Sequence, residues 1–241
     1  MKEKNDTLVF QGRRRLLVDE LSATGLFSEK VLKAIGAVPR HLFVQEGLEE
    51  LAYKDIPVAI EAGQTISQPS TVAFQTQLLD FKPGDRILEI GTGCGYQTAV
   101  LFYLGAEVFS IERQEELYHK AISNLTEAGY LFPEEEFSVS RIHLFLGDGF
   151  EGLKDLAPFD GIIVTCGAPS LPETLMRQLA PGGKMVIPVD EPGQEKVAEK
   201  KQILKVITRK PNGKFVGRDV SRMSFVPMLK GVEKKRKKNL I

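Results

Sequence analysis

Short apolar runs alternate with longer amphipathic stretches along this chain from residue 85 onward. The runs occupy residues 86–90, 107–111, 142–146, 161–165 and 184–188. Runs of about five residues rich in Val, Ile and Leu predict buried strands, and strands that alternate with helices are typical of a parallel sheet covered on both faces. The pattern therefore predicts an α/β fold with a doubly wound, mostly parallel sheet.

Two more strands are predicted near the end of the chain, at residues 203–208 and 223–228, with a turn at residues 211–213 between them. The pattern leaves their order in the sheet open. The polar stretch 190–201 that precedes them predicts an exposed loop.

The first 80 or so residues show the period of helices instead of strands. Val31, Leu32 and Ile35 share one face behind a predicted cap at Ser28, and residues 70–81 predict another helix. We expect these N-terminal helices to cover a cleft at the carboxyl ends of the strands, because ligands of such sheets bind there.

The first strand of the alternating region runs into three glycines, Gly91, Gly93 and Gly95. Glycine permits positive φ and lets the backbone approach a ligand closely, and the helix expected from Gln97 points its N-terminal amides at the same place. The spacing is shorter than the dinucleotide fingerprint, and the Lys-Ser/Thr pair of a phosphate-binding loop is missing. These features favour a nucleoside cofactor over a diphosphate.

Acidic residues follow the next two strands. Glu112 ends the second strand, where an acid typically accepts hydrogen bonds from ribose hydroxyls, although a solvated surface charge is the alternative. Asp148, between Gly147 and Gly149, follows the third strand and suits the exocyclic amine of an adenine, although Asp-Gly is also a common plain turn. Together with the glycine loop, the two acids predict an adenosine site.

In this order the three loops resemble the class I methyltransferases that bind S-adenosylmethionine. Further segments resemble the protein-L-isoaspartate (D-aspartate) O-methyltransferase family in particular, and the likeness covers about residues 16–229. These segments are 38–44, 63–69, 158–165, 181–184 and 224–227. The resemblance implies a Rossmann-like fold and protein repair, in which a methyl group passes from S-adenosylmethionine to a carboxylate of an age-damaged protein. The acceptor is the α-carboxylate of an L-isoaspartyl residue or the side-chain carboxylate of a D-aspartyl residue.

The resemblance also implies roles for individual residues. Ser67 is the implied catalytic residue, whose hydroxyl orients the acceptor carboxylate, while from residue types alone it fits a helix cap equally well. The implied substrate residues are Ile66, Ser67, Val226 and Pro227, the last two as an edge strand that pairs with the substrate backbone or as an ordinary sheet edge. The implied cofactor-binding residues are Gln64, Thr65, Ile66, Gly91, Thr92, Gly93, Glu112, Asp148 and Gly149.

The implied reaction needs no general base. A carboxyl group with a pKa near 4 is already ionised at neutral pH, so the acceptor attacks as it is. His41, His119 and His143 accordingly form no catalytic-looking cluster in the sequence. Charge disappears in the transition state of this displacement, so positioning and exclusion of water supply most of the acceleration.

Some positions depart from the family pattern. Ser70 and Thr71 are small and polar where relatives carry bulkier residues, Leu153 replaces an aromatic residue, and Cys166 replaces a smaller one. None of these changes removes a group that the displacement requires, so they bear on substrate range and not on the reaction.

The length of 241 residues suits one domain and is too short for two enzymes. We expect a single domain over residues 1–230, with a helical cover at about 8–82 and a Rossmann-like core at about 83–230. Residues 231–241 are expected to form a tail that methylation does not need. The basic run 234–238 within it favours a solvated tail over a surface for RNA or membrane.

Composition and charge limit the classes of partner that the sequence favours. The 32 basic and 32 acidic residues cancel, so no overall field attracts nucleic acid. The start lacks the apolar core of a signal peptide, and no apolar run reaches membrane-spanning length. Cys94 and Cys166 suggest neither a metal site nor a disulfide framework. We expect a cytoplasmic monomer that uses no metal.

Two other functions fit the same scaffold. A methyltransferase for RNA would show a basic face that bears aromatic residues, and one for a small molecule remains open. A cofactor-binding protein without catalysis would fit best without Ser67 or Glu112, and both are present. A nicotinamide dehydrogenase is disfavoured by the glycine spacing.

Overall fold

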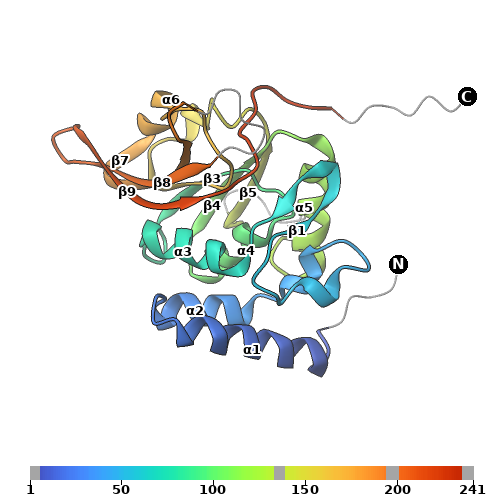
Figure 1. The fold of residues 1–241 in the computed structure, drawn as a ribbon. Coiled ribbons are helices and arrows are strands. Elements are labelled where there is room, and N and C mark those ends of the chain that lie inside the picture. Colours follow the sequence, from blue (N-terminus) through green and yellow to red (C-terminus); the bar gives the residue numbers. More distant parts are fainter. Residues whose placement is uncertain (1–5, 133–138, 194–200, 235–241) are drawn as a thin grey trace, which may run out of the picture.

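A seven-stranded sheet runs through the computed structural model, which describes residues 6–132, 139–193 and 201–234 (Figure 1). The strand order is β5-β4-β3-β6-β7-β8-β9, with β3 to β7 parallel and the last two antiparallel. The strands are β3 (Arg86–Ile90), β4 (Glu107–Glu112), β5 (Ile142–Leu146), β6 (Phe159–Val164), β7 (Leu179–Asp190), β8 (Gln202–Arg209) and β9 (Phe215–Met223). The predicted doubly wound, mostly parallel sheet is confirmed.

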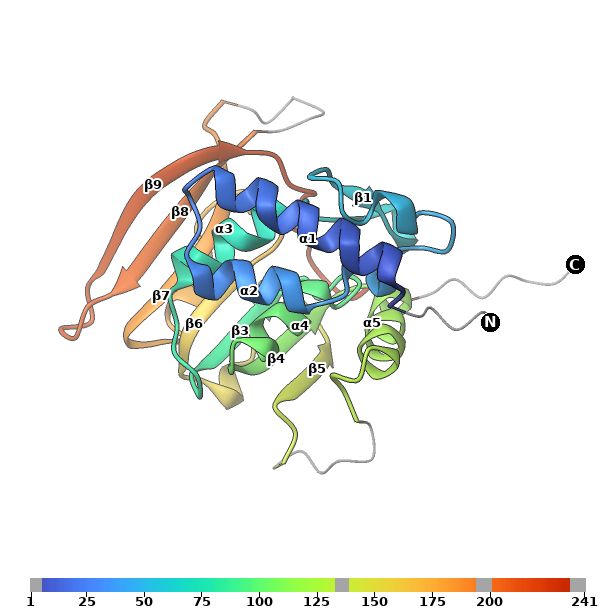
Figure 2. The same cartoon turned by 90° about the horizontal axis from the view of Figure 1, so that it is seen from below.

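Helices cover both faces of this sheet. Figures 1 and 2 show α3 and α4 on one face, with α1 and α2 as a further layer beyond them, and α6 on the opposite face. The α-helices are α1 (Leu8–Ala23), α2 (Glu29–Ala37), α3 (Pro69–Leu79), α4 (Tyr96–Tyr103), α5 (Glu115–Glu127) and α6 (Glu173–Met176). Short 3-10 turns are η1 (Arg40–Phe43), η2 (Glu49–Leu51), η3 (Glu61–Gly63) and η4 (Lys154–Leu156).

Alternate residues of the strands fill two separate cores. On β3, Ile87 packs in the core beneath α3 and α4, whereas Leu88 and Ile90 pack in the core on the other face. This alternation follows from the period of two along a strand. Burial on both faces explains why the parallel strands appeared in the sequence as continuous apolar runs.

The order of the strands reverses beside β3, which pairs with β4 on one side and β6 on the other. The chain moves outward from β3 to β4 and β5 and then returns to β6. Loops at the carboxyl ends of β3 and β6 therefore diverge, and this divergence opens a crevice where ligands of such sheets bind.

The strand predicted at residues 223–228 is wrong in its position. The turn closes with a hydrogen bond from the Lys210 N–H to the Lys214 carbonyl, so the returning chain pairs with β8 at once and β9 starts at Phe215. The outer strand is mostly exposed, so it lacks the apolar run that marks a buried strand.

The first two helices do not cover the crevice as predicted. Of the first 82 residues, those that line it come from α3 and the segment between α2 and α3, and none comes from α1 or α2. The two helices pack instead on each other, and α2 packs on α3 and α4, because their apolar faces complete the core on that side. Ser28 does precede α2, but its side chain makes no cap hydrogen bond.

Some predictions fall partly outside the described residues. The polar loop expected at 190–201 includes residues 194–200, and the basic run 234–238 includes residues 235–238, none of which the structure describes. Within the described part of the chain, no helix has the length and apolar character needed to cross a membrane.

Candidate functional site

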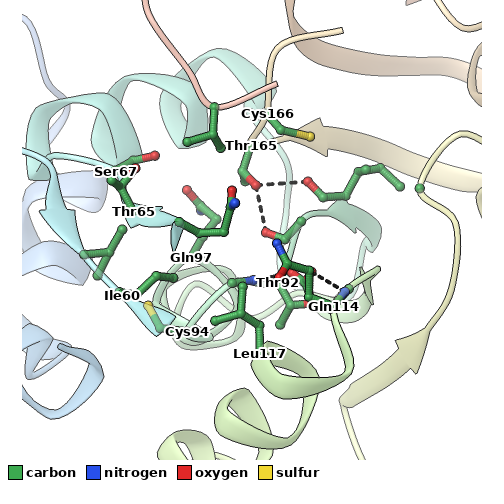
Figure 3. A pocket seen from close by; sticks show the side chains of 18 of the residues that line it. Ile60, Thr65, Ser67, Thr92, Cys94, Gln97, Gln114, Leu117, Thr165 and Cys166 are labelled. Atoms are coloured by element: carbon green, nitrogen blue, oxygen red, sulfur yellow. Dashed lines mark hydrogen bonds between the residues drawn. The ribbon is translucent and has the colours of Figure 1, made fainter. Parts of the chain in front are cut away.

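A cleft opens at the carboxyl ends of β3, β4 and β6 (Figure 3). Much of its wall comes from the glycine loop after β3, residues 111–114 at the end of β4, residues 60–67 before α3, and residues 226–229 after β9. Further lining residues come from α3, α4, α5 and the loops after β5 and β6. The predicted cofactor and substrate residues lie on its wall, with the exception of Asp148. The structure thus brings together groups that lie more than 160 residues apart in sequence.

The glycine loop takes a backbone path that side chains would obstruct. Gly91, Gly93 and Gly95 have φ angles of 93°, 56° and 92°, in the region that favours glycine. A Cβ atom on Gly91 would lie 2.5 Å from Thr165 Oγ1. The Thr165 hydroxyl lies 2.7 Å from the Gly91 carbonyl oxygen, which it bonds as a donor, so the end of β6 holds the loop in place.

Two buried hydroxyls and a buried carboxyl support the loop from beneath. The Thr92 and Ser110 hydroxyl oxygens lie 2.6 Å apart, and the Thr98 hydroxyl donates to Glu89 Oε2 at 2.5 Å. Glu89 is fully buried, and burial raises the pKa of its carboxyl to about 7. It does not line the cleft, so its contribution is to the loop and α4 rather than to a ligand.

Glu112 connects the glycine loop to the end of β4. Its Oε2 accepts from the Gly93 N–H and its Oε1 from the Gln114 N–H, each at 2.9 Å. Burial raises the pKa of the Glu112 carboxyl, and the backbone N–H groups oppose that shift. Each carboxylate oxygen has two lone pairs, so an acceptor position remains on each for a pair of ribose hydroxyls.

Asp148 lies apart from the other predicted residues. Its Oδ1 accepts from the Phe150 N–H at 2.9 Å, and its Oδ2 accepts from the Gly231 N–H at 2.7 Å. Gly149 lines the cleft, whereas the Asp148 side chain faces the returning C-terminal segment. The hydrogen bond to Phe150 is that of an Asx turn, the alternative weighed for this residue.

Residues 64–67 form the wall opposite the glycine loop. Thr65 and Ile66 make up β2 (Thr65–Ile66), which pairs antiparallel with β1 (Val58–Ala59), and Ser67 follows (Figure 3). The helix after it has Gln68 at the N-cap position, and the Ser67 hydroxyl makes no hydrogen bond to any described residue. Ser67 is therefore not the cap of α3, and its hydroxyl is available in the cleft.

Residues 226–228 pair with a loop instead of forming a sheet edge. The Gly167 N–H donates to the Val226 carbonyl, and the Met228 N–H donates to the Gly167 carbonyl, both at 2.8 Å. Val226 and Pro227 line the cleft, but the Val226 carbonyl and the Met228 N–H are already paired with Gly167. The predicted edge strand at Val226 and Pro227 is thus replaced by an isolated bridge to Gly167, and β9 ends earlier, at Met223.

The sequence analysis missed several polar residues of the cleft. Gln75 donates through Nε2 to the Val164 carbonyl at 2.9 Å, and Gln97 donates through Nε2 to Thr76 Oγ1 at 3.0 Å. Both glutamines are buried on otherwise apolar helix faces, which is the sequence signal that marks them. Thr165 was detectable too, because it directly follows the strand beside the switch point.

The cysteine and histidine side chains of the described residues supply no general base to the cleft. Burial raises the pKa of Cys94 to about 11 and that of Cys166 to about 12, so both are neutral thiols at neutral pH. No histidine lines the cleft, and His41 instead lies 2.7 Å from the Tyr53 hydroxyl. Within the described residues, no group of His, Cys, Asp and Glu side chains is placed to hold a metal ion.

This arrangement fits an adenosine-containing cofactor. The glycine loop leaves room for close approach, Glu112 offers acceptors for a ribose, and Ile111 and Leu117 provide apolar surface for a base. Across the cleft, Ser67 offers a free hydroxyl to a second ligand (Figure 3). The cleft can therefore hold two reactants and position them by hydrogen bonds.

The chain matches known proteins over nearly its whole length. The family model "Protein-L-isoaspartate(D-aspartate) O-methyltransferase (PCMT)" matches residues 12–233. A protein-L-isoaspartate O-methyltransferase from Flavobacterium psychrophilum is 48% identical over 224 residues, which cover 93% of this chain and 97% of the relative. One from Halorhodospira halophila is 44% identical over 236 residues, which cover 96% of this chain and 99% of the relative.

Solved structures show the same fold. A crystal structure from Plasmodium falciparum, named as a protein-L-isoaspartate O-methyltransferase in complex with S-adenosyl-L-homocysteine, superposes with a TM-score of 0.75 at 27% identity. The match covers 90% of this chain and 99% of that one. A second structure of the same name has a TM-score of 0.74 at 27% identity and covers 89% of this chain and 65% of its own.

Proposed function

This chain belongs to the protein-L-isoaspartate (D-aspartate) O-methyltransferase family, and we propose that its cleft performs that family's reaction with the residues described above. The enzyme transfers a methyl group from S-adenosylmethionine to isoaspartyl residues of damaged proteins, as its close relatives do. The free Ser67 hydroxyl across the cleft from the glycine loop is the observation that carries the assignment of roles.

We propose that the glycine loop and Glu112 hold the nucleoside of the cofactor. The backbone at Gly91 and Gly93 has the shape to admit it, and Glu112 keeps an acceptor position on each oxygen for the ribose. Gln64, Thr65 and Ile66 enclose it from the opposite wall. When bound, S-adenosylmethionine supplies an electrophilic methyl group on a cationic sulfur.

The acceptor side is formed by Ser67, Ile66, Val226 and Pro227. The Ser67 hydroxyl donates to the acceptor carboxylate and aligns one of its oxygens with the methyl group, while the apolar neighbours exclude water. The Val226 carbonyl already accepts from Gly167, so backbone pairing with the substrate at Val226 uses the Val226 N–H, which donates to no described residue.

The lack of a histidine in the cleft suits this acceptor. An isoaspartyl α-carboxylate is ionised at neutral pH, so its oxygen needs alignment and not deprotonation. The neutral thiols of Cys94 and Cys166 leave the transferred methyl group without a competing thiolate. The cleft therefore favours carboxylate methylation.

The test is transfer of labelled methyl groups to a matched pair of peptides, one isoaspartyl and one aspartyl. We expect labelling of the isoaspartyl peptide and little of its aspartyl partner, because only the former presents a free α-carboxylate at the altered linkage. Equal labelling of both peptides, or transfer only to RNA or small molecules, would refute the repair function.

The domain organisation, oligomeric state and cellular location are proposals as well. We propose a single-domain monomer in the cytoplasm that needs neither metal nor nucleic acid; the free thiols of Cys94 and Cys166 support a reducing location. Sedimentation of the purified protein tests the oligomeric state, and cell fractionation tests the location.

A further inference from the structure

We propose that Gln97 is a cofactor-binding residue, whose side-chain carbonyl oxygen accepts a hydrogen bond from the α-ammonium group of S-adenosylmethionine. The proposal rests on the proposed function, since it places the amino-acid end of the cofactor beside the glycine loop. It adds a residue that selects this cofactor by its amino group.

The Gln97 side chain is buried yet faces the cleft. It belongs to the first turn of α4, is 7% exposed and lies between Thr92 and Ser67 in the close-up (Figure 3). Its Oε1 atom is buried and accepts no hydrogen bond from any described residue. A buried carbonyl oxygen without a donor is rare in folded proteins and indicates a missing partner.

The missing partner is a hydrogen-bond donor. Gln97 Nε2 donates to Thr76 Oγ1 on α3 at 3.0 Å, which occupies the nitrogen of the amide and leaves the oxygen as its unpartnered atom. A carboxylate or carbonyl group of a ligand would therefore meet the wrong atom.

The neighbourhood favours an ammonium group that shares a carbon with a carboxylate. The N–H groups of the first turn of α4 have no partners within the helix and suit a carboxylate. An amino acid places its ammonium and carboxylate side by side, so an acceptor within the same turn is correctly placed for the ammonium group. Gln97 supplies that acceptor.

The carboxylate of the cleft has another task. Among the described residues that line the cleft, Glu112 has the sole carboxylate, and the acceptor position that remains on each of its oxygens is assigned above to the ribose. A neutral amide has an advantage at position 97, because the same cleft must admit an anionic acceptor. A glutamate there would bind the ammonium group but repel the acceptor carboxylate.

Calorimetry with two ligands tests the proposal: S-adenosylhomocysteine and its deamino analogue, in which a hydrogen atom replaces the α-ammonium group. We expect Gln97→Met, which is similar in length, to reduce the preference for S-adenosylhomocysteine about tenfold, with little change for the analogue. Gln97→Glu should keep the preference but raise the KM for an isoaspartyl peptide. Thermal unfolding without ligand verifies that each variant is folded.

Thr76→Val provides a second route, because Thr76 anchors the amide without lining the cleft. The preference should fall in this variant as well, including if Gln97→Met does not fold. If the folded variants keep the wild-type preference for S-adenosylhomocysteine over the deamino analogue, and the wild type binds normally, the role of Gln97 is overturned. The proposed cofactor site then remains. A higher peptide KM in Gln97→Met with unchanged preference overturns it too, by assigning Gln97 to the acceptor. Failure of the wild type to bind S-adenosylhomocysteine refutes the cofactor site itself.

Discussion

Glu112 Oε2 lies 2.9 Å from the backbone nitrogen of Gly93, so the acid at the end of β4 holds the glycine loop that follows β3. Two strands of the sheet are thereby joined at their carboxyl ends by a side chain that also faces the cleft. An acid at this place has two tasks, because it shapes the cradle before any ligand arrives and offers acceptors to a ligand afterwards.

Replacement of Glu112 should consequently affect both stability and cofactor binding. Glu112→Ala leaves the N–H groups of Gly93 and Gln114 without their acceptor, and we expect a loss of about 1 to 3 kcal/mol in the free energy of unfolding. S-adenosylmethionine binding should weaken by about 1.5 to 3 kcal/mol. Chemical denaturation and calorimetry measure the two effects. Unchanged affinity would show that the nucleoside lies elsewhere.

Ser67→Ala should act on turnover alone. The hydroxyl makes no hydrogen bond to any described residue and caps no helix, so the folded protein loses nothing when it is removed. We expect turnover on an isoaspartyl peptide to fall about ten- to a thousandfold, the range for one positioning contact. Steady-state kinetics measure turnover, and calorimetry with S-adenosylhomocysteine verifies the unchanged cofactor site. Full turnover in the variant would remove Ser67 from the mechanism.

Glu89 should make stability depend on pH in an unusual direction. Burial raises its pKa from 4.5 to about 7, so between these values the folded protein binds more protons than the unfolded chain. Stability from this group is fully present below pH 4.5 and is lost as pH rises to about 7, by at most about 3 kcal/mol.

The matched variant for this effect is Glu89→Gln, which retains an acceptor for the Thr98 hydroxyl. We expect the stability of the wild type relative to the variant to be greater at pH 5 than at pH 8, as measured by denaturant unfolding. If the difference in the free energy of unfolding between the wild type and Glu89→Gln is the same at pH 5 and pH 8, Glu89 titrates normally in the folded protein.

Two truncations should separate the ordered C-terminal segment from the residues beyond it. Arg113 Nε donates to the Gly231 carbonyl, and the Arg113 guanidinium lies 2.9 Å from a Glu233 carboxylate oxygen. The first residues of the tail expected at 231–241 are thus attached beside the cleft, so the two truncations test where the dispensable part begins. A chain that ends at Lys234 should methylate peptides like the full chain. One that ends at Lys230 should bind S-adenosylhomocysteine about tenfold more weakly, because Arg113 and Asp148 lose their partners.

Kinetics on a short isoaspartyl peptide and calorimetry compare the two truncated chains. If both truncated chains match the full chain in peptide kinetics and in S-adenosylhomocysteine affinity, the contacts of Gly231 and Glu233 have no part in the site. A loss already present in the longer of the two would place the important residues after Lys234.

The sequence predicted those parts of the site that depend on local structure. The glycines after β3 and the acid after β4 could be placed because a parallel sheet brings successive strand ends to one edge. Contacts between distant segments were not predictable in this way. The Gln97 amide is oriented by Thr76 on another helix, and Gly167 pairs with Val226, so neither relationship leaves a periodic signal in the sequence.

The misplaced last strand has a similar cause. Residues 223–228 are more apolar than 215–223, yet hydrogen bonding to β8 begins directly after the turn and selects the more polar segment. Backbone pairing next to a tight turn outweighed side-chain hydrophobicity, because an outer strand needs little burial.

The wall of the cleft at residues 226–229 comes from the segment that follows the last strand of the sheet, whereas Ser67, the glycine loop and Glu112 precede that strand. The sheet and the glycine loop alone leave one side of the cleft open, and the segment that returns across the strand ends completes its wall.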